Sequence, residues 1–144
     1  MGAIVRLLNT TLDGTKSSVA ALANVKGIGV PLARAILRKA GIRFDKRLMD
    51  LTEEEIRKIE EIARDPLKYG IPGWMLNRHR DPHDGKSYLL LGDEVTLAEK
   101  KDIALMKRIK CWKGIRHSLG LKVRGQRTRT TGRRGRTVGY KKKK

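Results

Sequence analysis

The sequence predicts a mainly α-helical globule over residues 1–112, followed by an extended basic tail over residues 113–144. Three observations support this prediction: apolar residues recur at helical spacing, helix start and stop signals flank those segments, and the acidic residues end at Asp102. The net charge is +19, and residues 103–144 carry +16 of it, because they hold 16 Lys and Arg and no Asp or Glu. A charge distribution this uneven indicates that the tail binds a polyanion.

Start and stop signals predict three helices in the N-terminal half. Residues 17 to 25 have helical apolar spacing and precede a glycine. A second helix is expected from 31 to 41, since proline suits a first helical turn and glycine suits a helix end. The third helix has the clearest start, because Thr52 and Glu55 stand at the spacing of a capping box. Before these helices, the apolar run from 4 to 9 predicts a strand or an extended lead-in.

The middle of the chain is expected to be loop, followed by a fourth and longer helix. Residues 66–93 are interrupted repeatedly by proline and glycine, so they predict turns. Trp74, Met75 and Leu76 are expected to pin this loop to the core. A capping-box pattern begins the fourth helix near Thr96, and the helix is expected to run to about residue 110. Its predicted apolar stripe consists of Ala98, Leu105, Ile109 and Trp112.

The residue types argue against an enzyme, a cofactor site and a membrane protein. Cys111 is the only cysteine and has no nucleophile signature around it. His79 and His83 are four residues apart, but the Asp81-Pro82 pair between them argues against a helical metal site. The chain has no long apolar run and only 4% aromatic residues. We therefore expect phosphate contacts rather than base stacking to dominate binding.

The segment VKGIGVPLARAIL, residues 25–37, contains two glycines one residue apart between two short helices. Such a turn can direct backbone N–H groups at the start of the second helix toward a phosphate. It resembles the helix-hairpin-helix and helix-two-turn-helix elements that bind nucleic-acid backbones without reading sequence. Lys26, Gly27 and Gly29 are the candidate phosphate site. A tight interhelical turn with no ligand is the alternative reading of the same residues.

The segment KGIRHSLGLKVRGQRTRTTGRRGR, residues 113–136, crowds donors into a short span around glycines. Arginine predominates over lysine from Arg124 to Arg136, which favours bidentate phosphate contacts and stacking on splayed bases. A flexible solubilising tail is the alternative.

This late segment carries a family resemblance. KGIRH at 113–117, then Gly120 and VRGQ at 123–126, resembles the signature of the thirteenth small-subunit ribosomal protein family, the eighteenth in eukaryotic naming. LLNTTLDG, VKGIG, IPGWMLNR and TTGRRGRTVG are similar to eukaryotic and archaeal members, in the same order over nearly the whole chain.

The resemblance implies a helix-two-turn-helix core in the head of the small subunit and a C-terminal extension threading into head rRNA. It also implies contacts to a neighbouring head protein and to the large subunit, and it leaves contact with peptidyl-site tRNA open. The expected location is the cytoplasmic ribosome, with nuclear or nucleolar assembly in a eukaryote. Together, the residues and the resemblance predict RNA contacts at Lys26, Gly27, Gly29, Lys113, Arg116, His117, Lys122, Arg124, Gln126, Arg127, Arg129, Arg133, Arg134 and Arg136.

Two other functional classes remain alternatives from the residues alone. A DNA-binding module of the repair or architectural kind would also use a glycine turn and a basic tail. Such a module has no reason to contain residues 113–126. A protein-interaction adaptor using the acidic third helix would leave the tail unexplained.

Overall fold

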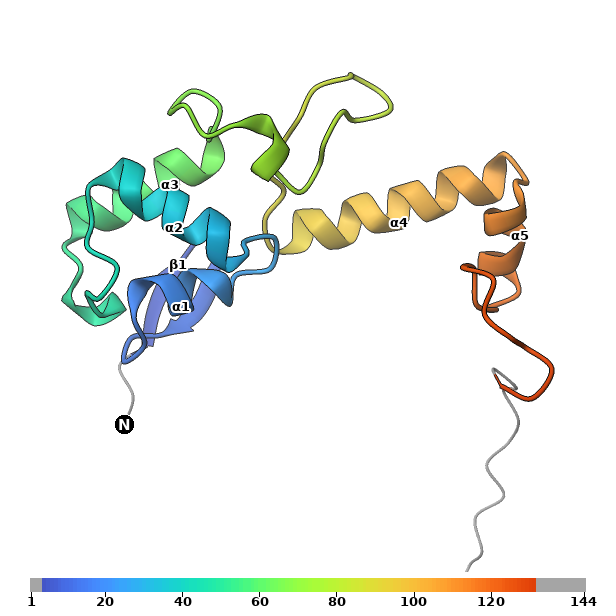
Figure 1. Cartoon of the computed structure of the whole chain (residues 1–144), viewed down its shortest axis with the longest axis horizontal. Coiled ribbons are helices and arrows are strands. Elements are labelled where there is room, and N and C mark those ends of the chain that lie inside the picture. Colours follow the sequence, from blue (N-terminus) through green and yellow to red (C-terminus); the bar gives the residue numbers. More distant parts are fainter. Residues whose placement is uncertain (1–3, 132–144) are drawn as a thin grey trace, which may run out of the picture. The chain divides into compact units, whose positions relative to one another are not determined.

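A computed structural model describes residues 4–131 of the chain. These residues form two compact units, which divide between Leu97 and Ala98 (Figure 1). Helices dominate the described residues, so the predicted mainly α fold is confirmed. The elements are β1 Ile4–Leu7, β2 Thr10–Asp13, α1 Ser18–Ala23, α2 Val30–Ala40, the 3-10 turn η1 Leu48–Asp50, α3 Glu53–Arg64, the 3-10 turn η2 Gly73–Met75, α4 Asp93–Arg108 and α5 Trp112–Ser118.

The N-terminal segment forms a hairpin rather than a lone strand. β1 and β2 pair antiparallel, with Leu7 opposite Thr10. The two residues between them, Leu8 and Asn9, have φ angles of 50° and 59°. Positive φ at both positions is the geometry of a two-residue hairpin turn whose twist matches the strands. The predicted strand is confirmed, and the prediction missed its partner strand.

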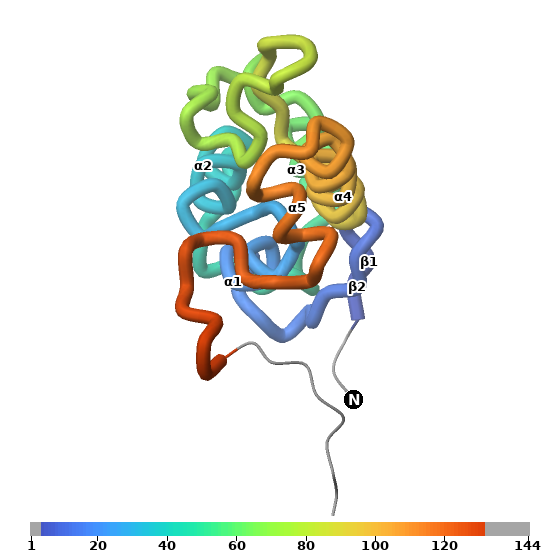
Figure 2. Tube along the Cα trace, turned by 90° about the vertical axis from the view of Figure 1, so that its right-hand side faces the viewer, coloured from blue at the N-terminus to red at the C-terminus, as the bar shows by residue number. Residues whose placement is uncertain are grey.

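The helices α1, α2 and α3 form the core of the first unit, with α2 in contact with both others (Figure 2). All three begin and end on local signals. Ser17 caps α1, and Gly41, with φ of 75°, ends α2. In α3, the Thr52 side chain accepts from the Glu55 amide while the Glu55 carboxylate accepts from the Thr52 amide. The predicted capping box is therefore confirmed.

Aliphatic side chains fill the interior of this unit. Burying one such side chain stabilises a fold by about 1.5–3 kcal/mol. One polar side chain, Ser18, is buried among them, and its hydroxyl and backbone amide both donate to the carbonyl of Lys46. The largest fully buried hydrophobic side chains are Leu7, Leu22, Val25, Ile36, Leu37, Leu48, Ile59 and Ile71.

The loop between α3 and α4 is anchored as expected at two of its three predicted residues. Leu76 is buried and Met75 packs against the core. Trp74 was wrongly predicted to pin the loop, because its side chain is 75% exposed. The 3-10 turn η2 directs Met75 and Leu76 to the core. The same turn leaves the side chain of Trp74 in solvent.

The fourth helix, α4, begins three residues before the predicted start and has no buried residue. Asp93 and Glu94 occupy its first turn, where carboxylates interact favourably with the helix dipole. Lys110 has a φ of 57°, a left-handed conformation that interrupts the helical backbone between α4 and α5. Trp112 therefore opens α5 and does not belong to the α4 stripe, contrary to the prediction.

The start of the predicted extended tail is helical, because α5 covers Trp112–Ser118. That part of the prediction is wrong. The boundary proposed after residue 112 otherwise stays a prediction. Within residues 4–131, no helix combines the length and apolar composition that crossing a bilayer requires.

Candidate nucleic-acid interface

The turn between α1 and α2 is held by two buried apolar residues. Val25 and Ile28 are 1% and 4% exposed, and the amide of Ile28 donates to the carbonyl of Val25 over 3.0 Å. Gly29 follows as the N-cap of α2 and is exposed. The turn therefore fixes where α2 begins and leaves its N-terminal end at the surface.

Position 27 requires glycine, because the loop that precedes α4 packs directly against it. Its φ is +105°, and a Cβ at this position would lie 2.2 Å from the carbonyl oxygen of Leu90. The side-chain amide nitrogen of Asn77 would lie 3.0 Å from the same Cβ. No other residue type fits here without moving backbone, so the glycine permits the loop to approach the turn.

Asn77 is the residue that fastens the loop to this turn. Its Nδ2 donates to the carbonyl of Leu90 over 2.7 Å, and its Oδ1 accepts from the Leu90 amide over 2.9 Å. Nδ2 also lies 3.4 Å from the carbonyl oxygen of Gly27. The role of Asn77 could not be predicted from the sequence, because nothing near it in the chain identifies partners 13 and 50 residues away.

Lys26 is engaged within the same unit. Its Nζ donates to Thr96 Oγ1 over 2.6 Å, and its carbonyl accepts from the Gly92 amide over 2.8 Å. The lysine side chain is exposed, so its charge still reaches solvent. Of the three predicted residues, Lys26 and Gly27 thus have structural partners in the protein, whereas Gly29 stands at the open end of α2.

The N-terminal end of α2 is suited to an anion. Its first turn contains no acidic residue, and among residues 4–131 no acceptor receives the amide hydrogens of Gly29 and Val30. Helix N-termini carry a partial positive charge that favours phosphate. Farther along α2, Arg34 and Arg38 are exposed and form no ion pair within the described residues.

In the second unit, α5 carries three of the predicted RNA-binding residues: Lys113, Arg116 and His117. Gly114 permits close packing there, since a Cβ would lie 2.0 Å from the carbonyl oxygen of Met106. The Arg116 guanidinium lies 5.7 Å from the centre of the Trp112 ring, and its Nε donates to the Lys122 carbonyl over 3.0 Å. Arg116 therefore holds the following turn in place as well as supplying charge.

The residues after α5 turn on glycines and expose cations. Gly120, with φ of 67°, ends α5, where its amide donates to the His117 carbonyl and the Leu121 amide donates to the Arg116 carbonyl. This is a Schellman arrangement. Farther on, the Gln126 side chain accepts from the Arg124 amide over 3.0 Å. The exposed cations of this segment are Lys122, Arg124, Arg127 and Arg129.

Comparison with known proteins identifies the family. The model of the family described as "Ribosomal protein S13/S18" matches residues 6–134. A protein of Staphylothermus marinus named "Small ribosomal subunit protein uS13" is 52% identical over 141 residues, covering 98% of this chain and 93% of its own. The chain belongs to this family. The family predicted from the late signature is therefore confirmed.

Two further relatives bear the same name. The one from Pyrobaculum calidifontis is 53% identical over 142 residues, covering 99% of this chain and 92% of its own. The one from Methanocaldococcus jannaschii is 45% identical over 141 residues, covering 98% and 94%. Because the similarity spans both units, the S13/S18 family assignment applies to the whole chain and not to the glycine turn alone. The family is one of ribosomal proteins rather than enzymes.

The structure brings the predicted site residues of this S13/S18 family member into two groups. Lys26, Gly27 and Gly29 meet at the α1–α2 turn in the first unit, and the group from Lys113 to Arg129 lies in the second. The predicted contacts Arg133, Arg134 and Arg136 lie outside the described residues. In the described part of the chain, no cluster of three metal-ligating side chains occurs.

Proposed function

We propose that this chain is a structural component of the small ribosomal subunit that binds rRNA. The observation that carries the proposal is the charge distribution in a member of the S13/S18 family: 16 Lys and Arg, with no acid, follow Asp102. Phosphate neutralisation with release of counterions supplies the binding free energy. Glycines along the segment let the backbone follow a folded phosphate surface.

The two units have different tasks in this proposal. The first presents the N-terminal end of α2, where Gly29 and Val30 offer amide hydrogens to one backbone phosphate. The second supplies Lys113, Arg116, His117, Lys122 and Arg124. Gln126, Arg127 and Arg129 extend this contact surface, and Arg133, Arg134 and Arg136 continue it along the chain.

The finer assignments follow the family resemblance. We place the rRNA contacts in the head of the small subunit, beside a neighbouring head protein, with the protein acting in the cytoplasmic ribosome. Contact with the large subunit and with peptidyl-site tRNA belongs to the same proposal, and the tail from Arg124 onward is the part that would reach tRNA.

In-cell crosslinking of the tagged full chain, followed by sequencing of the attached nucleic acid, tests the proposal. We expect crosslinks concentrated at a few sites in small-subunit rRNA, and a tRNA signal only if the tail reaches the peptidyl site. Crosslinks spread over genomic DNA would replace this proposal with architectural DNA binding. Mapping the crosslinked peptides assigns each RNA site to the α2 end or to the residues after α5.

A further inference from the structure

A pocket of about 470 Å³ lies between the end of α3 and the loop that precedes α4. Leu76 and Leu89, 6% and 8% exposed, line its inner part. Tyr88 and Leu67 line it nearer the surface and are 37% and 51% exposed.

The walls of this pocket are fixed by hydrogen bonds. Tyr88 pairs with Arg78, its amide donating to the Arg78 carbonyl over 2.8 Å and its carbonyl accepting from the Arg78 amide over 3.2 Å. The Arg78 Nε lies 2.8 Å from Oδ2 of Asp81, three residues farther along the same loop. A hydrogen bond from the His83 amide, followed by that from Arg78, holds the pKa of Asp81 below its ordinary value and keeps it charged. The backbone of Tyr88, on one wall of the pocket, is therefore held in place.

The opposite wall is the 3-10 turn η2. A Cβ on Gly73 would lie 3.7 Å from Leu67 Cδ2 and 3.9 Å from Ser87 Oγ, so this turn sits directly against the other wall. Trp74 follows Gly73 with 75% of its surface exposed. Trp74 is not among the lining residues, but it is the direct chain neighbour of Gly73, which is one of them. Tryptophan is highly buried on average in folded proteins, so an exposed tryptophan next in the chain to an apolar pocket indicates a ligand surface.

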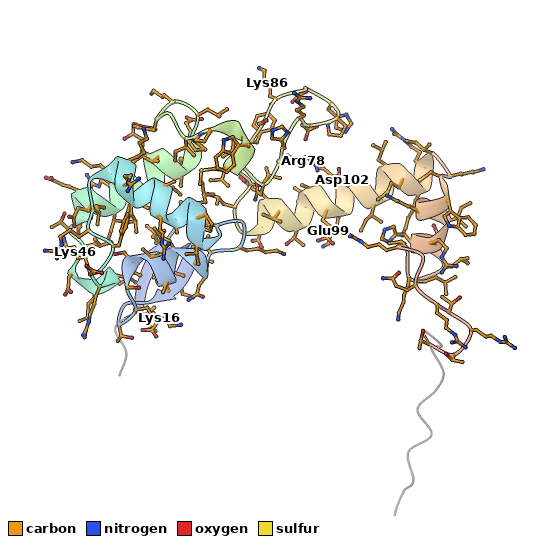
Figure 3. All side chains as sticks on the ribbon, viewed as in Figure 1. Lys16, Lys46, Arg78, Lys86, Glu99 and Asp102 are labelled. Carbon is orange, nitrogen blue, oxygen red and sulfur yellow. The ribbon has the colours of Figure 1, made fainter. Side chains whose placement is uncertain are left out.

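Two cations line the same pocket. Arg64 stands at the end of α3, and Lys86 projects from the loop that precedes α4 (Figure 3). Within residues 4–131, neither forms an ion pair. Asp65, which follows Arg64 in the chain, is the acidic residue of this lining, so the pocket combines aromatic and aliphatic surface with one net positive charge.

We propose that Trp74 and the Tyr88 pocket bind an unstacked base of single-stranded RNA, with Arg64 and Lys86 contacting its phosphates. Aromatic side chains stack on splayed bases, and lysine and arginine contact the backbone beside them. An apolar peptide would leave the net positive charge of the pocket without a partner, whereas a nucleotide supplies a planar face and an anion together. The inference rests on the proposed function and adds base stacking to its phosphate contacts.

The test uses the fluorescence of Trp74 in the full chain. The chain has two tryptophans, so Trp112→Phe leaves Trp74 as the only one and keeps a ring for Arg116. We expect short single-stranded oligoadenylate to quench the Trp74 emission to saturation. Inorganic polyphosphate, which has the charge but no bases, should leave the emission unchanged. Equal responses to the two probes would overturn the proposal.

Affinity measurements supply the second readout. Trp74→Ala or Tyr88→Ala should weaken oligoadenylate binding by roughly 5- to 150-fold, the range of one lost stacking contact, and Trp74→Phe should retain most of it. Phe44→Ala is the matched control, since Phe44 is 37% exposed like Tyr88 but lies outside this pocket, and it should leave the affinity unchanged. Unchanged affinity in the Trp74→Ala variant would contradict the proposal.

The outcomes separate this inference from the proposed function. If neutralising Lys122, Arg124 and Arg127 weakens RNA binding while Trp74 emission stays constant, only the base pocket fails. If those tail substitutions have no effect, the proposed function fails as well. Trp74 emission that responds to purified ribosomal proteins and not to RNA would assign the pocket to a protein partner and overturn the base-binding proposal.

Discussion

Gly27 and Gly29 are two residues apart and differ in what the fold requires of them. Gly27→Ala places a Cβ 2.2 Å from the Leu90 carbonyl oxygen at a φ of +105°, so backbone must move. We expect a loss of about 2 kcal/mol or more in the free energy of unfolding, measured by urea denaturation. Gly29→Ala is the control, because its nearest contact is Pro31 Cδ at 3.7 Å. It should cost less than about 1 kcal/mol.

Asn77 joins the loop to that turn from an exposed position. Asn77→Ala removes both hydrogen bonds to the Leu90 backbone, and we expect a loss of about 1–2 kcal/mol in thermal or urea unfolding. Asn24→Ala is matched in residue type and exposure, and in the described part of the chain its side chain makes no hydrogen bond. Equal losses in the two variants would contradict the role assigned to Asn77.

In the α1–α2 turn, the sequence predicts the candidate residues but not the residues that they contact. The two glycines and Lys26 were recognised from local spacing alone. Their partners could not be, since Lys26 bonds a threonine 70 residues away and Gly27 faces an asparagine 50 residues away. A glycine needed for close backbone approach and one needed to expose a helix end look identical in the sequence. Only the contact with Leu90 distinguishes them.

Among the helices, α3 depends most visibly on a local start signal. Thr52→Ala removes the acceptor for the Glu55 amide, and we expect a loss of about 1 kcal/mol in the free energy of unfolding. Thr52→Ser keeps the hydroxyl and should retain most of the stability. A helical content that falls without any shift in the unfolding midpoint would contradict this assignment.

The same cap predicts a pH dependence. The hydrogen bond from Lys46, 2.6 Å long, and then that from the Thr52 amide lower the pKa of Glu55 below its ordinary value. Because the folded pKa is the lower one, the carboxylate stabilises the fold fully above its ordinary pKa. This contribution is lost as the pH falls through the lowered value. Glu55→Gln should be less stable at neutral pH and lose less stability on acidification, measured by urea denaturation across pH.

How far an element could be predicted depended on whether its signals are local. α2 and α3 begin and end where proline, glycine and the capping box indicated. The hairpin was missed because Leu8 adopts φ of 50°, a conformation that leucine rarely takes and that β-strand pairing imposes. α4 begins at Asp93 and not near Thr96, because the acids of its first turn favour a helix start as much as the predicted cap does.

Over the whole molecule, charge separates the two parts of the chain more sharply than secondary structure does. Residues 1–102 are close to neutral at +3, which is the total of +19 less the +16 that follows Asp102. A nearly neutral globule can fold without strong self-repulsion, whereas the remainder attracts polyanions at a distance. The sequence alone was enough for this division, because counting charges needs no knowledge of contacts.

This division predicts how RNA binding responds to salt. If 6–10 phosphates are contacted, affinity should fall by roughly 10³–10⁵ between 50 and 200 mM salt. Replacing Lys122, Arg124 and Arg127 by alanine should reduce the slope of log affinity against log salt by about 2–3, since each lost phosphate contact removes a little under one unit.

The matched control for that variant replaces three exposed arginines of the first unit, Arg43, Arg47 and Arg57, and so has the same net charge. If phosphate contacts after α5 carry the binding, the control keeps the original slope, because cations that contact no phosphate act only through the screened field. Equal slopes in the two variants would mean that net charge alone, and not the placement of these cations, determines the affinity for rRNA. Titration of a labelled small-subunit rRNA fragment at several salt concentrations separates the two.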